Sequence, residues 1–218
     1  MRIIHSSDLH GSYKGLLAID DEFDLWIDTG DFFPNKTRGN HQIETRYQTK
    51  WAEHKSLGPR LVDWLDGRSL VSVGGNHDYI SLADLVVDSG GSAHNLSSGS
   101  AEVGGMVFAG FREIPFIIGE WNGEAHDFSG LVHDALEADP DVLVTHAPPA
   151  GILDSPEYPC GIPGLANALT YSNHRIKAHF FGHVHDSKGD MLLRLGREDQ
   201  VGIRFVNGAT QIALWTVE

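Results

Sequence analysis

Five short apolar segments, each followed by Asp, Asn or His beside Gly or another small residue, are the feature that most constrains this fold. The segments are residues 2–6, 24–28, 69–73, 141–144 and 178–181. Continuous apolar runs of about four to six residues are typical of strands that are covered on both faces. Because helical patterns separate the runs, the sequence predicts an α/β domain whose site lies at the carboxyl ends of the strands.

Six helices are expected between these strands. They span residues 13–19, 41–56, 59–65, 82–88, 129–138 and 163–171. Pro59 suits the start of a helix, since the N–H that proline lacks would be unpaired there. Residues 101–111 and 201–217 are each expected to form an antiparallel pair of strands around Gly-containing turns. The chain has no internal repeat and no Pro/Ser-rich linker, so residues 1–218 are predicted to form a single domain.

The composition argues against several classes of protein. With 30 acidic and 16 basic residues, the formal net charge is −14, which disfavours binding to the backbone of long nucleic acids. The single cysteine, Cys160, excludes an internal disulfide framework and fits a reducing compartment. No signal peptide is recognised, and no run approaches the ~20 apolar residues that cross a bilayer. We therefore expect a cytoplasmic protein without a membrane partner.

Nine polar residues follow the predicted strands and would converge on one rim if the strands were neighbours in one sheet. They are Asp8, His10, Asp31, Asn76, His77, Asp78, His146, His183 and His185. Imidazole combined with carboxylate and amide oxygen selects Mn, Fe, Zn or Ni over Ca. Asp8 and His10 are two residues apart at a strand end, so both can reach one ion. Asp31, which follows a glycine, is expected to bridge two ions ~3.5–4 Å apart.

Each motif also has a purely structural explanation. Asp8 could cap a helix, residues 74–78 could form a tight turn, and His146 could be a hydrogen-bonded core residue. The joint occurrence of all the motifs favours a metal site. His5 and His179, inside predicted strands, are expected to pack in the core or to orient the ligands. Cys160 is expected to be a buried, inert thiol.

These residues resemble, in order, the five signature blocks of the calcineurin-like metallophosphoesterases. The blocks are Asp8-Leu9-His10, Gly30-Asp31, Gly75-Asn76-His77-Asp78, Thr145-His146 and Gly182-His183-Val184-His185. The resemblance spans roughly residues 3–186 and implies a four-layer αββα sandwich of two mixed β-sheets flanked by helices. Four further stretches resemble the small phosphodiesterase branch, namely residues 146–154, 160–161, 179–183 and 205–209. The segment at residues 111–128 is longer than in that branch.

The resemblance also implies a centre of two divalent transition-metal ions. Mn²⁺ is the first choice, with Fe, Zn or Ni open. One ion would be held by Asp8, His10, Asp31 and His185. The other would be held by Asp31, Asn76, His146 and His183.

The expected reaction is attack on phosphorus by a hydroxide that bridges the two ions. The ions would lower the pKa of the bridging water from 15.7 toward ~7. His77 is expected to protonate the leaving group as a general acid, a contribution of ~10²–10⁴ in rate. Asp78 is expected to hold the ring or the backbone of His77 in place.

A small phosphodiester, such as a cyclic or modified nucleotide, is the expected substrate. A diester carries one negative charge, and the few cationic candidates near the motifs include Arg38 and Arg112. Asn76 and His77 would also contact the substrate, and Phe33 or Tyr158 could stack on a base. Other loop aromatics that could line a pocket are Phe32, Tyr79 and Trp121. The alternatives are a phosphomonoesterase or protein phosphatase, a short-strand nuclease, and a catalytically inactive metal-bound scaffold.

Overall fold

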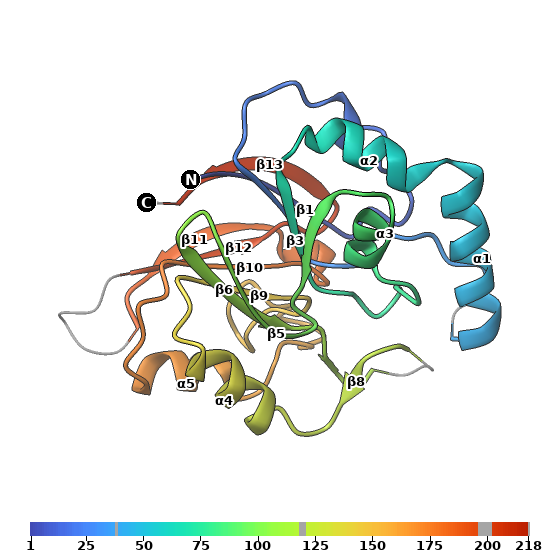
Figure 1. Ribbon diagram of the computed structural model, residues 1–218. Helices are drawn as coiled ribbons and strands as arrows, with labels where there is room; N and C mark the ends of the chain where they lie inside the picture. Colours follow the sequence, from blue (N-terminus) through green and yellow to red (C-terminus); the bar gives the residue numbers. More distant parts are fainter. Residues whose placement is uncertain (38, 118–120, 196–201, 218) are drawn as a thin grey trace.

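The computed structural model describes residues 1–37, 39–117, 121–195 and 202–217. It confirms the expected αββα sandwich, because two large sheets pack face to face and helices cover both outer surfaces. Figure 1 shows α1 to α3 and the pair α4 and α5 on opposite sides of the sheets. No helix among the described residues is long and apolar enough to cross a membrane.

The first sheet has five strands in the order β13-β1-β2-β3-β4. The strands are β1 (Arg2–Ser7), β2 (Leu25–Asp28), β3 (Ser69–Ser72), β4 (Ser92–Asn95) and β13 (Gln211–Thr216). Only β13 runs antiparallel to its neighbour. The helices on this side are α1 (His41–His54), α2 (Leu57–Leu65) and α3 (Leu82–Asp88), with a 3₁₀ turn at Leu16–Ala18.

The second sheet has six strands in the order β11-β12-β10-β9-β6-β5. The strands are β5 (Ser98–Val103), β6 (Met106–Phe111), β9 (Val142–Thr145), β10 (Ala178–Phe181), β11 (Gly189–Leu193) and β12 (Ile203–Asn207). The four inner strands are parallel, and both edge strands are antiparallel to their neighbours. The helices on this side are α4 (Ser129–Glu137) and α5 (Leu165–Tyr171), and a 3₁₀ turn spans His185–Ser187. A separate small sheet consists of β7 (Ile114–Pro115) and β8 (Glu124–Ala125).

Alternating side chains of the buried strands divide the core into three apolar layers, as the two-residue period of a strand requires. In β2, Ile27 points into the layer between the sheets, whereas Trp26 packs outward with Leu61 of α2. In β10, Phe180 lies between the sheets and Phe181 faces α4 and α5. The apolar runs of the sequence are therefore continuous because both faces of these strands are covered.

The five motif strands are not neighbours in one sheet. Strands β1, β2 and β3 belong to the first sheet, and β9 and β10 belong to the second. The two sheets pack so that the carboxyl ends of all five strands meet at one edge of the sandwich. The site is therefore built between two sheets rather than along the rim of one.

The expected pairing of strands within residues 201–217 is wrong. β12 pairs with β10 and β11, whereas β13 crosses to the first sheet and pairs with all six residues of β1. The link at residues 208–210 resembles a hairpin turn, but it carries the chain from one sheet to the other. The expected helix at 13–19 is only the 3₁₀ turn at Leu16–Ala18. The strands β4 and β11 were not expected, because both are largely exposed edge strands without the buried apolar run of the motif strands.

Candidate metal centre

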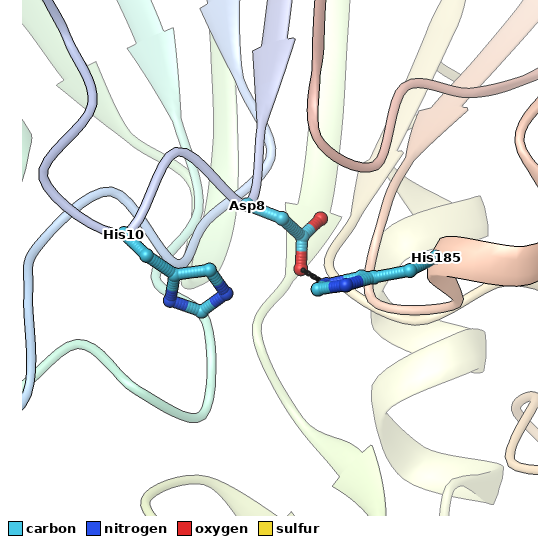
Figure 2. A group of neighbouring side chains, drawn as sticks. All are labelled: Asp8, His10 and His185. Atoms are coloured by element: carbon cyan, nitrogen blue, oxygen red, sulfur yellow. Dashed lines mark hydrogen bonds and ion pairs between the residues drawn. The ribbon is translucent and has the colours of Figure 1, made fainter.

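The strand-end residues form one connected cluster of potential metal ligands. Three overlapping groups have ligand atoms within 4.8 Å of one another: Asp8, His10 and His185; His10, Asp31 and His77; and Asp8, Asp31 and His146. Figure 2 shows the first group, with the Asp8 carboxylate between the rings of His10 and His185. Asp8 and Asp31 each belong to two groups, so the carboxylates connect the cluster.

The Asp8 carboxylate is buried and held from both of its oxygens. Oδ1 lies 3.1 Å from His185 Nε2, and Oδ2 accepts hydrogen bonds from Ser7 Oγ at 2.6 Å and from the His183 N–H at 2.9 Å. Burial alone would raise the pKa of Asp8, but the contact with His185 and the nearby His146 hold that pKa below its usual value. Asp8 is therefore an ionised and fixed candidate ligand.

The wholly buried His146 requires a cation at its inner nitrogen. Nδ1 lies 2.6 Å from the Thr29 carbonyl oxygen, which can only accept, so Nδ1 carries the hydrogen. Nε2 then faces two further oxygens, Asn76 Oδ1 at 3.1 Å and Asp31 Oδ2 at 3.4 Å. Burial would lower the pKa of His146, but the Asp31 carboxylate raises it to about 9. Either a proton or a metal ion can satisfy this nitrogen and these oxygens together.

The spacing of these ligand atoms fits a metal ion. Bonds from Zn²⁺ to nitrogen and oxygen ligands are ~2.0–2.2 Å long, so adjacent ligands of one such ion lie roughly 3.0–3.5 Å apart. The contacts of His146 and the contact between Asp8 and His185 fall in this range, at 3.1–3.4 Å. The His183 ring lies beside His146 with the centroids 4.9 Å apart. Burial and the charge of His146 lower the pKa of His183 to about 4, so its ring nitrogen is free of a second proton at neutral pH.

The structure thus brings all seven expected ligands to one edge. Their division between two ions stays a prediction.

Four of the candidate ligands have backbone angles in the left-handed region, with φ of 54° for Asp8, 43° for His10, 57° for Asp31 and 68° for His183. Such conformations cost of order 1–3 kcal/mol each and persist where the surrounding structure fixes them, commonly at functional sites.

Two glycines allow the motif loops to approach each other. A Cβ atom on Gly75 would overlap the backbone and the carboxylate of Asp31, and one on Gly30 would overlap the backbone of Gly75. The buried Asp78 carboxylate joins the same loops, since it accepts hydrogen bonds from the N–H groups of Asp31 at 2.7 Å, Gly75 at 3.0 Å and Phe33 at 3.0 Å. These bonds of Asp78 hold the backbone around Asp31 rather than the His77 ring, and its expected catalytic role stays a prediction.

The His77 ring is oriented by Asn35, a residue that the sequence did not single out. Asn35 Nδ2 donates to the His77 carbonyl at 3.0 Å, which leaves Asn35 Oδ1 to accept from His77 Nδ1 at 2.6 Å. His77 Nε2 is then directed inward, 3.9 Å from Asp31 Oδ2. Burial lowers the pKa of His77, and Asp31 opposes this change. Gln48 Nε2 also donates to the His77 carbonyl, at 2.7 Å.

The residues expected to bind substrate have different positions. Phe33 is wholly buried and packs against Phe32 and Trp51, so the expected stacking of Phe33 on a base is corrected to a core role. Arg112 Nη2 donates to the carbonyl oxygens of Gly75 at 2.7 Å and Asp78 at 3.1 Å. Tyr158 is 79 % exposed, and its role in binding stays a prediction. Arg38 lies outside the described residues.

An open cleft of about 570 Å³ begins at Asp8 and His10. Its other lining residues are Leu9, Ser12, Thr210 and Ile212. No sequence pattern indicated Thr210 or Ile212, because they reach the site only through the unexpected crossing of β13 to the first sheet. The cleft gives a small molecule access to the candidate ligands.

Two buried histidines lie behind the ligands. His5 Nε2 contacts Thr29 Oγ1 at 3.0 Å, and the carbonyl of the same Thr29 accepts from His146. His179 Nε2 contacts Thr145 Oγ1 at 2.8 Å. Burial lowers the pKa of both His5 and His179 to about 3, so both rings are neutral at physiological pH. Burial also raises the pKa of Cys160 to about 11, as an inert thiol requires.

Comparison with known proteins agrees with this geometry. Residues 1–187 match the family model described as calcineurin-like phosphoesterase. No curated protein matched the chain. Members of this family use a centre of two divalent metal ions to hydrolyse phosphoric esters, and the candidate ligands found here fit such a centre. The chain belongs to the calcineurin-like phosphoesterase family.

Proposed function

We propose that this metal-dependent phosphoric ester hydrolase acts on small phosphodiesters, such as cyclic or modified nucleotides, with Mn²⁺ as the preferred ion. The observation that supports a diester is the charge around the centre. Among the described residues, no Lys or Arg side chain forms an ion pair with Asp8, Asp31 or Asp78. Arg112 is engaged with two backbone carbonyls of the motif loop.

Charge favours a diester at such a site. A phosphomonoester brings about two negative charges at neutral pH, and a diester brings one. The extra charge of a monoester needs cations beyond the metal ions, and Arg is the side chain best suited to bind it. With buried carboxylates at Asp8 and Asp31, the pocket favours the less charged ester.

The proposed division of labour among the residues is the one that the family resemblance implies. Asp8, His10, Asp31 and His185 would hold one ion, and Asp31, Asn76, His146 and His183 would hold the other. When bound, the ions supply Lewis acidity and a water that ionises near neutral pH. The oxygen of water forms the new bond to phosphorus as the bond to the leaving group breaks. His77, whose Nδ1 hydrogen is bound by Asn35, would act in its doubly protonated form and give the second proton, on Nε2, to the departing oxygen.

The cell compartment and partners belong to the same proposal. The single Cys160 fits the reducing cytoplasm. The net charge of −14 disfavours long nucleic acids, so a small phosphate ester is the proposed partner.

A matched pair of substrates tests the diester preference. We expect kcat/KM for bis(4-nitrophenyl) phosphate to exceed that for 4-nitrophenyl phosphate, which has the same leaving group, in Mn²⁺ at neutral pH. Asp31→Asn is the control for contaminating phosphatases and should be inactive on both esters. A preference for the monoester that disappears in Arg38→Ala or Arg112→Ala would overturn the proposal.

A further inference from the structure

Two stretches that follow β6, residues 112–117 and 121–125, lie against the motif loop at residues 75–78. In the first stretch, Arg112 donates to the carbonyl oxygens of Gly75 and Asp78. In the second, the N–H of Asn122 donates to the Asn76 carbonyl at 3.2 Å, and Asn122 Nδ2 donates to the Asp78 carbonyl at 2.6 Å. Figure 1 shows β8, which lies in the second stretch, projecting away from the body of the second sheet. Arg112 and Asn122 thus join these two stretches to the loop that carries His77.

This anchoring places Trp121 against the His77 ring. The ring centroids are 4.4 Å apart, with an angle of 49° between the planes. The His10 ring packs edge-on against the same imidazole, with its centroid at 4.9 Å, and Asn35 binds its Nδ1. Trp121 is half-buried, so part of this residue is exposed to solvent. The ring of His77 therefore lies between the metal ligand His10 and an indole surface.

We propose that Trp121 forms the wall of the leaving-group pocket and that the enzyme selects esters whose leaving group carries a planar aromatic ring, such as a nucleobase or an aryl group. This inference rests on the proposed role of His77 as general acid. His77 can protonate only an oxygen beside Nε2, so the rest of the leaving group lies next to the residues that touch the imidazole. Of the described residues His10, Asn35 and Trp121, which contact the imidazole ring, Trp121 has the largest apolar surface. Stacking of a base on an aromatic side chain corresponds to roughly 5- to 150-fold in affinity.

A purely positioning role of Trp121 predicts a different result. If the indole only held His77, its replacement would lower kcat by the same factor for every ester with a similar leaving group. A stacking wall instead changes the ratio between substrates, and it acts on KM as well as on kcat. The ratio between two aromatic leaving groups of different area therefore separates the two roles.

The test compares methyl phosphodiesters with phenyl and 2-naphthyl leaving groups, whose phenols have similar acidity. In the native protein we expect kcat/KM to favour the naphthyl ester by about 5-fold or more. Trp121→Leu should bring the ratio close to one, and Trp121→Phe should keep part of it. The matched control is Phe116→Leu, because Phe116 is 56 % exposed on the first of the two stretches but stacks on His126. An unchanged ratio in a folded Trp121→Leu variant would overturn the proposal.

A binding experiment separates this proposal from the proposed function. (2-Naphthylmethyl)phosphonate and benzylphosphonate contain a C–P bond that the enzyme cannot hydrolyse, and calorimetry of the Mn²⁺-loaded protein measures their affinities. We expect tighter binding of the naphthyl compound in the native protein and loss of that preference in Trp121→Leu. If no ester is hydrolysed but this preference is found, the proposed function fails and the aromatic site stands. If esters are hydrolysed without any aromatic preference, the assignment of Trp121 is wrong.

Discussion

The His77 ring is contacted by residues outside the strand-end motifs as well as by His10. Asn35, His10 and Trp121 touch three parts of the imidazole, and only His10 belongs to a strand-end motif. The motif residues could be found from the sequence because each follows an apolar run. Asn35 and Trp121 follow no such pattern, and their roles depend on how distant loops pack. The sequence therefore predicts the candidate ligands and offers Trp121 as a pocket aromatic, but it indicates neither Asn35 nor the contact of Trp121 with His77.

At this scale, removing the His77 ring should separate metal binding from proton donation. We expect His77→Ala to keep both ions and to lose activity mainly on esters with poor leaving groups, by ~10²–10⁴. An activated aryl ester needs less protonation and should lose less. Elemental analysis and kcat/KM for both kinds of ester provide the measurement. As a control, Asp31→Ala should lose bound metal and activity together. An equal loss of kcat/KM on both kinds of ester in His77→Ala would contradict the general-acid role.

The neutral amide of Asn35 should set the pH range of His77. Asn35→Asp places a carboxylate at Nδ1, which favours the imidazolium form and raises the pKa of His77. Because a general acid must be protonated, the alkaline limb of the profile of kcat/KM against pH should move to higher pH. Asn35→Ala should lower activity by about 10-fold or more while the ions stay bound. A profile that does not move in Asn35→Asp would show that Asn35 does not act through His77.

At the scale of elements, the apolar runs predicted the strands well, whereas the pairing was right for β5 with β6 and wrong for β12 with β13. The runs at the motif strands match the observed elements within one residue, because these strands are covered on both faces. The segments β12 and β13 were expected to pair with each other, yet they belong to different sheets. Burial of one strand is encoded locally, whereas the choice of partner depends on which sheet edge is free. For β13 that edge is β1.

The contact between the motif loops predicts a severe effect of one methyl group. In Gly75→Ala the new Cβ would overlap Asp31, so the loops at residues 30–31 and 74–75 must separate. We expect a loss of about 1–3 kcal/mol in the free energy of unfolding, together with weaker metal binding. Chemical denaturation and metal titration measure the two effects. Gly130→Ala is the control, since a Cβ there meets no atom within 4 Å and Ala is the better helix former. Equal changes in the free energy of unfolding and in metal affinity in the two variants would refute the argument.

At the scale of the whole molecule, the metal centre lies where the two sheets meet. Asp8 and Asp31 follow strands of the first sheet, and His146 and His183 follow strands of the second. Bound ions should therefore stabilise the sandwich, by about 2.7 kcal/mol at a concentration of 100 times Kd. We expect Mn²⁺ to raise Tm relative to protein in EDTA, and Asp31→Asn to lose most of this rise. The same rise with Ca²⁺ at equal ionic strength would point to charge screening instead.

Burial of neutral histidines predicts how stability depends on pH. The folded pKa of His179 is about 3, because burial disfavours its charged form, whereas the unfolded chain binds the proton near the ordinary value of 6.5. Between these values the unfolded state holds one more proton, so the contribution of His179 is fully present above pH 6.5 and is lost as the pH falls toward 3. Between these two pKa values, each such group adds about 1.4 kcal/mol per pH unit to the slope of the free energy of unfolding against pH.

The variant His179→Gln isolates this effect. Glutamine can keep a hydrogen bond to Thr145 Oγ1 but does not titrate. Urea denaturation at several values between pH 4 and pH 6 should give a slope of the free energy of unfolding that is smaller by about 1.4 kcal/mol per pH unit. The control is His133→Gln, because His133 is exposed on α4 and should leave the slope unchanged. If the slope of His179→Gln equals that of the native protein, His179 gains its proton in the folded state, and the neutral ring behind Thr145 is not a feature of this core.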